Sequence, residues 1–347
     1  MTLLAVLVLA LAGCGSDDDA ADVTTEQTAA ATTEPAGETL KVGLVTDIGG
    51  LDDRSFNFLA NMGLERAQDE LGVEGRVLIS KRDADYVPNL STLARQDFDL
   101  VVAVGFLMAD ALNTVAQQFP ETKFAIIDFA AAGLASKPDN VRGLLFKEQE
   151  AGYLAGYLAG LYVADQGGDQ TISSVGGLKI PPVDRYIAGY QAGATAANPD
   201  VKTLNGYSQD FVDQAKCKEI ALNHISRGAV VVFQVAGQCG LGALSAAAER
   251  NVSGIGVDAD QGYLGAHILT SALKKVDVAV FDTVESVQDG SFTGGEDTVF
   301  DVASGGVGLG EMGDDVAADI VSRVNEIEDD IAAGEIADIP ETFSGTG

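Results

Sequence analysis

The sequence predicts an α/β protein made of two doubly wound lobes, each with a parallel sheet covered by helices on both faces. Continuous apolar runs such as residues 100–105 alternate with amphipathic segments, which is typical of parallel strands buried between helices. The alternation restarts after a long apolar helix at residues 148–164, so we expect a second lobe. Glycine contributes 41 of the 347 residues, which suits many tight turns between strands and helices.

Each predicted element follows from its own pattern of apolar residues. Phe58, Met62 and Leu71 recur at helical spacing, whereas the predicted strands are short apolar runs. The first lobe is predicted to contain strands 41–47, 76–80, 100–105, 123–128 and 141–146, helices 56–71 and 88–95, and a helix after residue 105 that ends at 119. The second is predicted to contain helices 148–164, 183–197, 213–227 and 241–250 and strands 171–175, 201–207, 230–236 and 254–258.

The composition supports a packed core and excludes some partners. Hydrophobic residues make up 46% of the chain and charged residues 21%. There are 52 acidic and 21 basic side chains, for a net charge of −31. Binding to nucleic acid or to anionic lipid needs clustered Lys and Arg, so we expect neither through basic patches. Because Trp is absent, a Trp-rich platform for sugars is also not expected.

The first residues are typical of a secretion signal. Residues 1–13 are uncharged and almost all Leu, Ala and Val, and this run is too short to span a bilayer. It ends in Leu11-Ala12-Gly13-Cys14, which resembles the bacterial lipobox, so we expect residues 1–13 to be a lipoprotein signal peptide and Cys14 to be lipid-modified. The segment departs from the usual signal-peptide pattern in one way, because no Lys or Arg precedes the apolar run.

Residues 14–38 form a predicted tether. Residues 15–38 contain seven acidic side chains and no bulky apolar residue beyond one Val, so they cannot bury a core and should be disordered. We therefore expect a body on a short acidic tether, lipid-anchored to the cell membrane on its extracytoplasmic face. Two further cysteines, Cys217 and Cys239, either pair as a disulfide in that compartment or remain two buried thiols.

Three carboxylates close predicted strands. Asp47, Asp128 and Asp258 each end an apolar run, as does Gly105, and ligands of open α/β sheets bind beyond the carboxyl ends of the strands. A single acid there is often only a helix N-cap. Three from two lobes would meet in one cleft, where carboxylates can hold a vicinal diol such as ribose or act as general acid and base.

Enzymatic motifs are not apparent. The sequence has no phosphate-binding loop, no zinc His-Glu-x-x-His motif and no Gly-x-Ser-x-Gly turn. His224 and His267 are isolated, and the glycine pattern at residues 308–313 is favoured as a turn because no βαβ unit follows. Asp258-x-Asp260 lacks the acid that a calcium loop needs at its twelfth position. We therefore expect no enzyme activity, no cofactor and no metal.

Two phenylalanines occupy predicted turns. Phe56 follows a polar turn after the first strand, and Phe211 follows Ser208-Gln209-Asp210 in the second lobe. A Phe at the start of a helix is often a packing staple. One from each lobe at a cleft could also stack on both faces of a flat heterocycle.

These residues belong to a longer signature. The segment from Thr46 through Asp47, Asp53 and Phe56 to Asn57 closely resembles the opening motif of the basic membrane protein (BMP) family of lipoproteins, the substrate-binding proteins of nucleoside ABC transporters, which includes purine nucleoside receptor A-like proteins. The resemblance extends over residues 41–309. It continues through Gly105-Phe106, residues 124–128, 148–156, 233–237 and 256–261, and Thr270-Ser271 with Lys274.

The resemblance implies a type I periplasmic-binding-protein fold, in which two Rossmann-like lobes are joined by crossing hinge segments. Each lobe is then discontinuous. We expect an N-terminal lobe of residues 39–146 with about 262–296. The C-terminal lobe would comprise residues 147–261 with about 297–340.

The resemblance also implies roles for individual residues. Phe56 and Phe211 would stack on the base, and Asp47 and Asn57 would bond its edge. The sugar would be held by Asp128, Asp258 and Lys274. Two segments depart from the family pattern and leave the base preference open: Asp210-Phe211-Val212-Asp213, where relatives often have Ser-Phe-Asp-Asp, and Gly237-Gln238-Cys239, where Gly-Gly-Thr is common.

The implied function is the capture of nucleosides, with purine nucleosides preferred. The protein is expected to be a monomer that delivers them to the permease and ATPase subunits of an ABC importer. Two alternatives stay open at this point: a receptor for another sugar or polyol on the same fold, and a surface sensor or antigen without transport. A nucleoside hydrolase is the least favoured reading, because no further catalytic signature accompanies the acids.

Overall fold

The computed structural model describes residues 39–168 and 170–342. The predicted signal peptide, Cys14 and the predicted tether at 14–38 lie outside the described residues. Within the described part, no helix is both long and apolar enough to cross a membrane.

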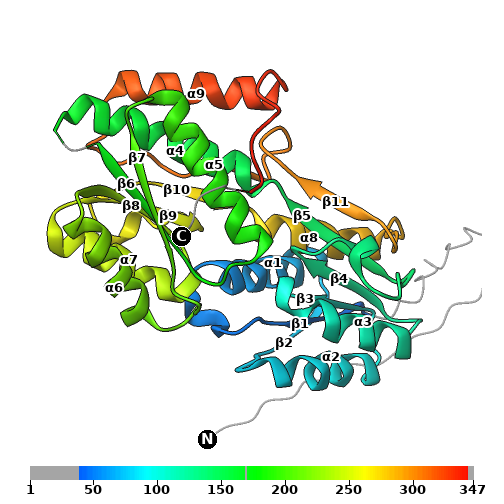
Figure 1. Ribbon diagram of the computed structural model, residues 1–347. Helices are drawn as coiled ribbons and strands as arrows, with labels where there is room; N and C mark the ends of the chain where they lie inside the picture. Colours follow the sequence, from blue (N-terminus) through cyan, green and yellow to red (C-terminus); the bar gives the residue numbers. More distant parts are fainter. Residues whose placement is uncertain (1–38, 169, 343–347) are drawn as a thin grey trace, which may run out of the picture. The chain divides into compact units, whose positions relative to one another are not determined.

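The first sheet has six parallel strands in the order β11-β5-β4-β3-β1-β2 (Figure 1). Its centre is fully apolar, which is why Leu100 to Ala103 are all buried with β1 on one side and β4 on the other. The strands are β1 (Lys41–Val45), β2 (Glu74–Leu78), β3 (Leu100–Ala103), β4 (Lys123–Ile127), β5 (Val141–Phe146) and β11 (Asp297–Phe300).

The second sheet repeats this arrangement, with the order β12-β10-β9-β8-β6-β7. Only β12 differs in direction, since it runs antiparallel to β10. The strands are β6 (Thr171–Gly176), β7 (Lys202–Tyr207), β8 (Ala229–Val235), β9 (Ser253–Asp258), β10 (Ile268–Lys274) and β12 (Val307–Leu309). The two orders match strand for strand, so β4 and β9 hold equivalent places and their carboxyl ends carry equivalent loops.

Helices cover both faces of each sheet, as predicted. In the first lobe α1 packs on α8, and α2 packs on α3. In the second lobe α4 packs on α5 and α9, while α6 and α7 pack together on the opposite face of the sheet (Figure 1). The helices are α1 (Phe56–Leu71), α2 (Tyr86–Arg95), α3 (Ala109–Gln118), α4 (Glu148–Gln166), α5 (Pro181–Ala197), α6 (Gln214–Ser226), α7 (Gly237–Arg250), α8 (Val276–Gln288) and α9 (Ala318–Ala332). Short 3₁₀ turns lie at Gly50–Asp53, Asp83–Asp85, Phe106–Met108, Ala131–Gly133 and Gly262–Leu264.

The chain crosses between the lobes near Lys147, near Lys275 and through residues 301–306. This corrects two predicted boundaries. Strand β10, inside the range 262–296 that we expected in the N-terminal lobe, pairs with β9 of the second sheet. Strand β11, inside the range 297–340 expected in the C-terminal lobe, pairs with β5 of the first sheet. Each crossing therefore falls after a strand rather than in the loop before it.

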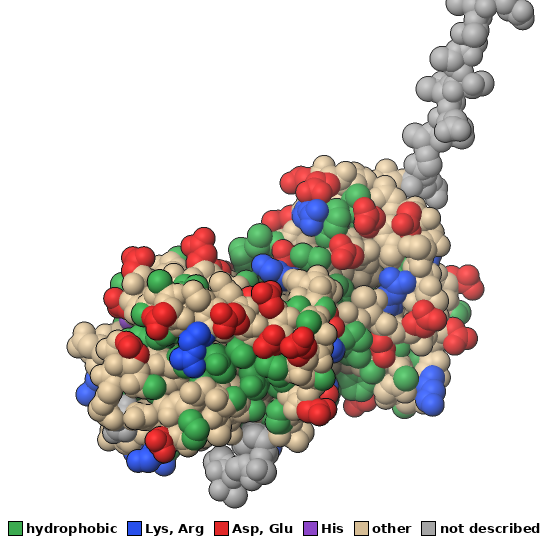
Figure 2. Space-filling view, turned by 90° about the horizontal axis from the view of Figure 1, so that it is seen from above, with side chains coloured by type: hydrophobic (Ala, Val, Ile, Leu, Met, Phe, Trp, Pro, Cys, Tyr) green, Lys and Arg blue, Asp and Glu red, His purple; other side chains and the backbone are tan. Residues whose placement is uncertain are grey.

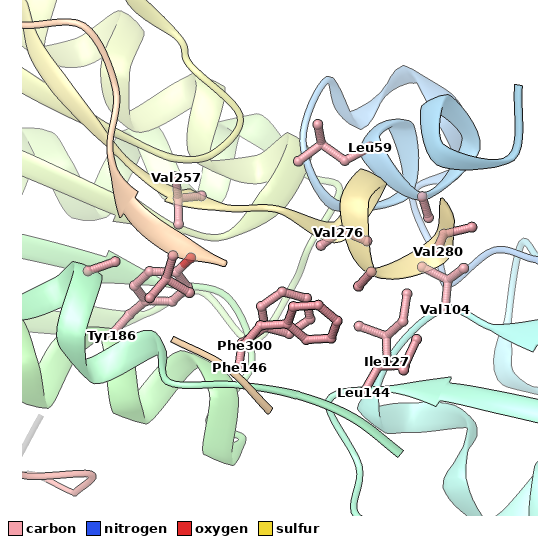
Figure 3. Close-up of a cluster of buried hydrophobic side chains, with 14 of the residues drawn as sticks. Leu59, Val104, Ile127, Leu144, Phe146, Tyr186, Val257, Val276, Val280 and Phe300 are labelled. Atoms are coloured by element: carbon pink, nitrogen blue, oxygen red, sulfur yellow. The ribbon is translucent and has the colours of Figure 1, made fainter. Parts of the chain in front are cut away.

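Aromatic and aliphatic side chains pack where the crossings meet (Figure 3). The rings of Phe146, at the end of β5, and Phe300, at the end of β11, stack with centroids 4.9 Å apart. Beside them the backbone N–H of Lys147 donates to the Phe300 carbonyl at 2.9 Å, and that of Lys275 donates to the Gly306 carbonyl at 2.9 Å. These contacts tie the three crossings together next to the carboxyl ends of the strands.

Candidate functional site

A pocket with about 650 Å³ of empty space, including open solvent, lies between the lobes at the carboxyl ends of the strands. Every ligand-binding residue predicted from the sequence lines it: Asp47, Phe56, Asn57, Asp128, Phe211, Asp258 and Lys274. Its other walls are mainly apolar or backbone: Ile48, Asp53, Gly105, Phe106, Ile180, Pro182, Val183, Tyr186, Val235, Ala236, Gly237, Gln238 and Val257.

Two aromatic rings reach the pocket from opposite lobes. Phe56 is the first residue of α1, and Phe211 lies in the loop between β7 and α6. Each ring rests on a glycine. A Cβ at Gly105 would lie 3.3 Å from the Phe56 ring, and one at Gly177 only 2.2 Å from the Phe211 ring. Both side chains are only half-buried, so each has ring surface for a ligand.

Asp128 and Asp258 occupy equivalent positions just at the ends of β4 and β9. Both have left-handed backbone, with φ of 69° and 61°. Non-glycine residues pay a conformational cost in this region, and such outliers concentrate at ligand sites. The two loops thus aim one buried carboxylate from each lobe at the same pocket.

Lys274 is held by carboxylates beneath the pocket. Its Nζ donates to Asp128 Oδ1 at 2.5 Å and to Glu148 Oε1 at 2.8 Å, and the side chain is 2% exposed. Burial acts to lower the pKa of Lys274, but the charges of Asp128, Glu148 and Asp258 outweigh it and raise that pKa. An ammonium has three N–H donors, so one remains for a ligand.

Asp258 is bonded within its own lobe and across to the other. Its Oδ2 accepts a hydrogen bond from Ser55 Oγ at 2.6 Å, and its Oδ1 accepts one from Tyr186 Oη at 3.4 Å. Burial raises the pKa of Asp258 above its usual range. The Ser55–Asp258 and Lys274–Asp128 bonds both join residues of different lobes at the pocket.

Asp47 and Asn57 form one polar corner. Asn57 Oδ1 accepts from the Asp47 backbone N–H at 2.7 Å, and Asn57 Nδ2 donates to Asp53 at 3.0 Å. Asp47 Oδ1 accepts from the Ile48 N–H and from the Tyr86 hydroxyl, whereas its Oδ2 lies toward Gly105. Burial raises the pKa of Asp47 to about 6. The corner thus offers one carboxylate oxygen and one remaining amide N–H.

Two residues that support this corner, Asp53 and Tyr86, were not predicted as site residues from the sequence. Asp53 accepts the backbone N–H groups of Ser55, Asn57 and Phe58 at 2.8–3.1 Å and so caps the start of α1. Asp53 lies two residues before the N-cap Ser55, so no capping pattern points to it. No local signal points to Tyr86 either, which reaches Asp47 from 39 residues away.

Cys217 and Cys239 are joined by a disulfide, with their Cα atoms 5.6 Å apart. The bond links α6 to the first turn of α7. His224 is buried in α6, where burial lowers its pKa to about 4. Across residues 39–168 and 170–342, no group of three His, Cys, Asp or Glu side chains is placed to hold a metal ion.

The two similar lobes, the crossings between them and the pocket at their strand ends define a solute-binding protein of the periplasmic type I fold. A solute-binding protein from Aeropyrum pernix has a similar structure, with a TM-score of 0.79 and 30% identity over 87% of this chain and 94% of that one. The family model of PnrA-like ABC transporter substrate-binding proteins (Bmp) matches residues 40–341, and the chain belongs to this family. The predicted family and fold are confirmed, and the family is one of binding proteins rather than enzymes.

Two curated relatives match this chain over nearly its whole length, and a third matches over about three quarters of it. A CD4+ T-cell-stimulating antigen of Listeria innocua is 34% identical, over 98% of this chain and 96% of that protein. An ABC transporter nucleoside-binding protein, BmpA, of Lactococcus lactis is 32% identical, over 95% and 94%. An uncharacterized lipoprotein of Pyrococcus horikoshii is 38% identical, over 75% and 66%. The chain therefore resembles relatives described as lipoproteins and as parts of ABC transporters.

Proposed function

We propose that this protein captures nucleosides, with purine nucleosides preferred, and delivers them to an ABC importer. The observation that carries the proposal is the placement of Phe56 and Phe211, one from each lobe, at a pocket whose polar side chains are mainly carboxylates. A flat base can stack on aromatic rings for about 1–3 kcal/mol per base. The description of the Lactococcus lactis relative as nucleoside-binding supports the same ligand class.

The charges of the pocket favour a neutral ligand. Asp47, Asp53, Asp128 and Asp258 line it, and the ammonium of Lys274 is shared between two carboxylates. Carboxylates accept hydrogen bonds from the hydroxyls of a ribose. A phosphate group would instead meet like charges, so nucleotides should be rejected.

We propose the ligand-binding roles predicted from the sequence, using the hydrogen-bond donors and acceptors that the protein's own contacts leave unused. The free oxygen of Asp47 and the last N–H of Asn57 bond the edge of the base. Asp128 and Asp258 accept from the ribose hydroxyls, and the third N–H of Lys274 donates to the sugar.

We further propose that the protein works as a monomer, anchored through Cys14 on the outer face of the cell membrane, and that its partners are the permease and ATPase subunits. The lipoprotein description of the Pyrococcus horikoshii relative supports the anchor. The body is acidic, and acidic side chains are spread over the face seen in Figure 2. Like-charged headgroups would therefore hold it off the membrane surface.

Calorimetry on ligand-stripped protein tests the proposal. The protein is unfolded, dialysed, refolded and titrated with inosine, adenosine, guanosine, ribose, free hypoxanthine and inosine monophosphate. We expect binding of the ribosides and much weaker binding of the other ligands. Ribose binding with no gain from the base would replace the proposal with a sugar receptor, and no heat with any riboside would overturn it.

A further inference from the structure

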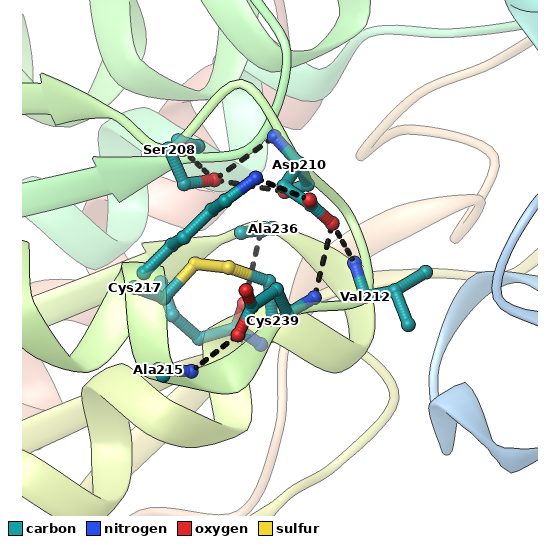
Figure 4. Close-up of a disulfide and its surroundings, with 11 residues drawn as sticks. Ser208, Asp210, Val212, Ala215, Cys217, Ala236 and Cys239 are labelled. Carbon is teal, nitrogen blue, oxygen red and sulfur yellow. Dashed lines mark hydrogen bonds and ion pairs between the residues drawn. A yellow bond between two sulfur atoms is a disulfide. The ribbon is translucent and has the colours of Figure 1, made fainter.

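Figure 4 shows the disulfide beside Ala236, which is one of the residues that line the pocket. Cys217 is in the first turns of α6, and Cys239 is in the first turn of α7. The residues just before Cys239, Ala236 to Gln238, line the pocket. The loop of residues 208–213, which carries Phe211, enters α6 four residues before Cys217. The bond therefore joins two segments that form the same wall.

Phe211 is fixed at its backbone by the cystine and at its ring by a glycine. The backbone N–H of Cys239 donates to the Phe211 carbonyl at 3.0 Å. The ring lies against Gly177, where no side chain would fit. The Phe211 carbonyl is hydrogen-bonded to Cys239, and the chain from Phe211 leads into α6, which contains Cys217. The disulfide therefore completes a small ring of bonds that includes the backbone of Phe211.

The loop is also tied to the end of β6, where the backbone N–H groups of Ser208 and Gln209 donate to the Gly176 and Gly177 carbonyls at 2.9 and 3.1 Å. The side-chain contacts of Asp210 are local or exposed. Asp210 accepts from the Val212 and Asp213 N–H groups at 2.8 and 3.0 Å, and its ion pair with Lys216 is largely open to solvent. Exposed ion pairs contribute little to stability. These bonds shape the loop itself, but they do not attach it to α7.

The fully buried packing between α6 and α7 is built from small side chains, and the larger Ile220, Leu222 and Ile225 of α6 are only partly buried against it. The buried cluster here contains Val175 and Val232 from the sheet, with the cystine and five alanines: Ala221, Ala236, Ala243, Ala246 and Ala247. Alanines bury little apolar area, so each contributes little free energy to holding the two helices together. The cystine is the covalent link between the two helix starts.

We propose that the Cys217–Cys239 disulfide positions Phe211 and thereby sets the affinity of the pocket for the base of its ligand. This inference rests on the proposed function. Both cysteines are fully buried, so an attacking thiolate has no access and the bond acts as a permanent clamp.

The test replaces both cysteines together, as C217A/C239A, so that no free thiol remains. We expect calorimetry to show inosine and adenosine binding about three-fold to thirty-fold more weakly. This loss corresponds to part of the full contribution of stacking. Ala246→Gly is the matched control, since it loosens the same cluster and keeps the disulfide. It should lower the thermal midpoint and leave affinity within two-fold.

A double-mutant cycle separates positioning from general stability. If the disulfide acts through the ring of Phe211, removing it in a Phe211→Ala background should change affinity by less than two-fold. An equal loss with and without the ring would overturn the inference, as would unchanged affinity of C217A/C239A while the wild type binds ribosides.

Hydrogen exchange gives a readout without ligand. In C217A/C239A the amide at position 239 and those of residues 210–213 should exchange faster, with residues 41–45 of the first sheet unchanged as an internal reference. If the wild type binds no riboside, the proposed function and the affinity effect both fail, whatever the exchange shows. If it binds and these amides stay protected, only the positioning inference fails.

Discussion

Phe56 and Phe211 are half-buried residues in a pocket whose other aromatic and aliphatic walls are mostly covered. Each packs against a glycine that leaves room for the ring, so the folded protein holds the ring in place without a ligand. A ring of this kind contributes to binding far more than to folding.

Replacing either ring should separate these two contributions. Phe56→Ala and Phe211→Ala should each weaken inosine binding by about 1–3 kcal/mol, because one stacking partner is lost. The thermal midpoint without ligand should stay nearly unchanged, and calorimetry with a thermal scan measures both. A large fall in that midpoint would mean that the ring belongs to the core.

Asp47 should make the folding free energy depend on pH. Its pKa is about 6 in the folded protein against an ordinary 3.8, since burial penalises the charged form. The folded state therefore holds this proton more tightly, and stability is lost as the pH rises through about 6. Relative to Asp47→Asn, which can still accept from Tyr86, the wild type should lose up to about 3 kcal/mol between pH 3.5 and 7.

Urea unfolding of both proteins at several pH values measures this difference, and the other carboxylates cancel because both proteins contain them. A difference in free energy that does not vary with pH would contradict a raised pKa for Asp47.

At the residue scale, the sequence was enough to select side chains that line one pocket, because strand ends and the family motif are both local signals. Their partners were not predictable. Glu148 meets Lys274 from 126 residues away and Tyr86 meets Asp47 from 39, so only the tertiary structure brings them together. Lys274 and Asn57 keep their proposed roles with few donors left for a ligand, since most of their hydrogen-bonding capacity is used inside the protein.

Helices α4 and α5 approach each other through glycines. A Cβ at Gly156 would lie 1.9 Å from the Tyr190 carbonyl oxygen, and one at Gly152 would lie 2.2 Å from that of Tyr186. Backbone cannot move aside as a flexible side chain can, so the helices would have to separate. Tyr186, which bonds Asp258, lies on this same interface.

Gly156→Ala should therefore destabilise the protein by about 1–3 kcal/mol, although alanine is the better helix former. Urea unfolding measures the loss. Asp165→Ala, at an exposed position of the same helix, is the control and should stay within about 0.5 kcal/mol. Equal stability of the Gly156→Ala protein and the wild type would show that the two helices can move apart freely.

At the element scale, strands and helices up to residue 258 were largely predictable, since buried parallel strands have an unmistakable apolar pattern. The start of α7 was not. It begins at Gly237 rather than 241, because Gly240 and Gly242 suggest a loop but are helix residues packed against Gln234 and the Gln214 carbonyl. After residue 258 the chain alternates between lobes, so neighbouring elements no longer share a sheet and the predicted boundaries failed.

At the scale of the whole molecule, Ser55 joins the two lobes directly by a hydrogen bond that needs no ligand. Its hydroxyl donates to Asp258 at 2.6 Å, from the residue before α1 to the end of β9. Ser55→Ala removes this bond and leaves a buried carboxylate with fewer donors. We expect inosine to dissociate several-fold faster, because closure of the lobes over the ligand is weakened.

Stopped-flow displacement of bound inosine measures that rate. Ser226→Ala serves as the control, because that hydroxyl bonds only to its own helix, at the Asn223 carbonyl. An unchanged dissociation rate in Ser55→Ala would show that the interlobe bond does not limit opening.

The three crossings near Lys147, Lys275 and residues 301–306 have a mechanical consequence. One connecting strand would let two bodies swivel freely, and two would still permit some twisting about the line between them. The three attachments are bonded to one another, so we expect rotation about a single axis to be the soft degree of freedom. Opening would then separate the facing rings along one reproducible arc, so the protein returns to the same geometry after each release.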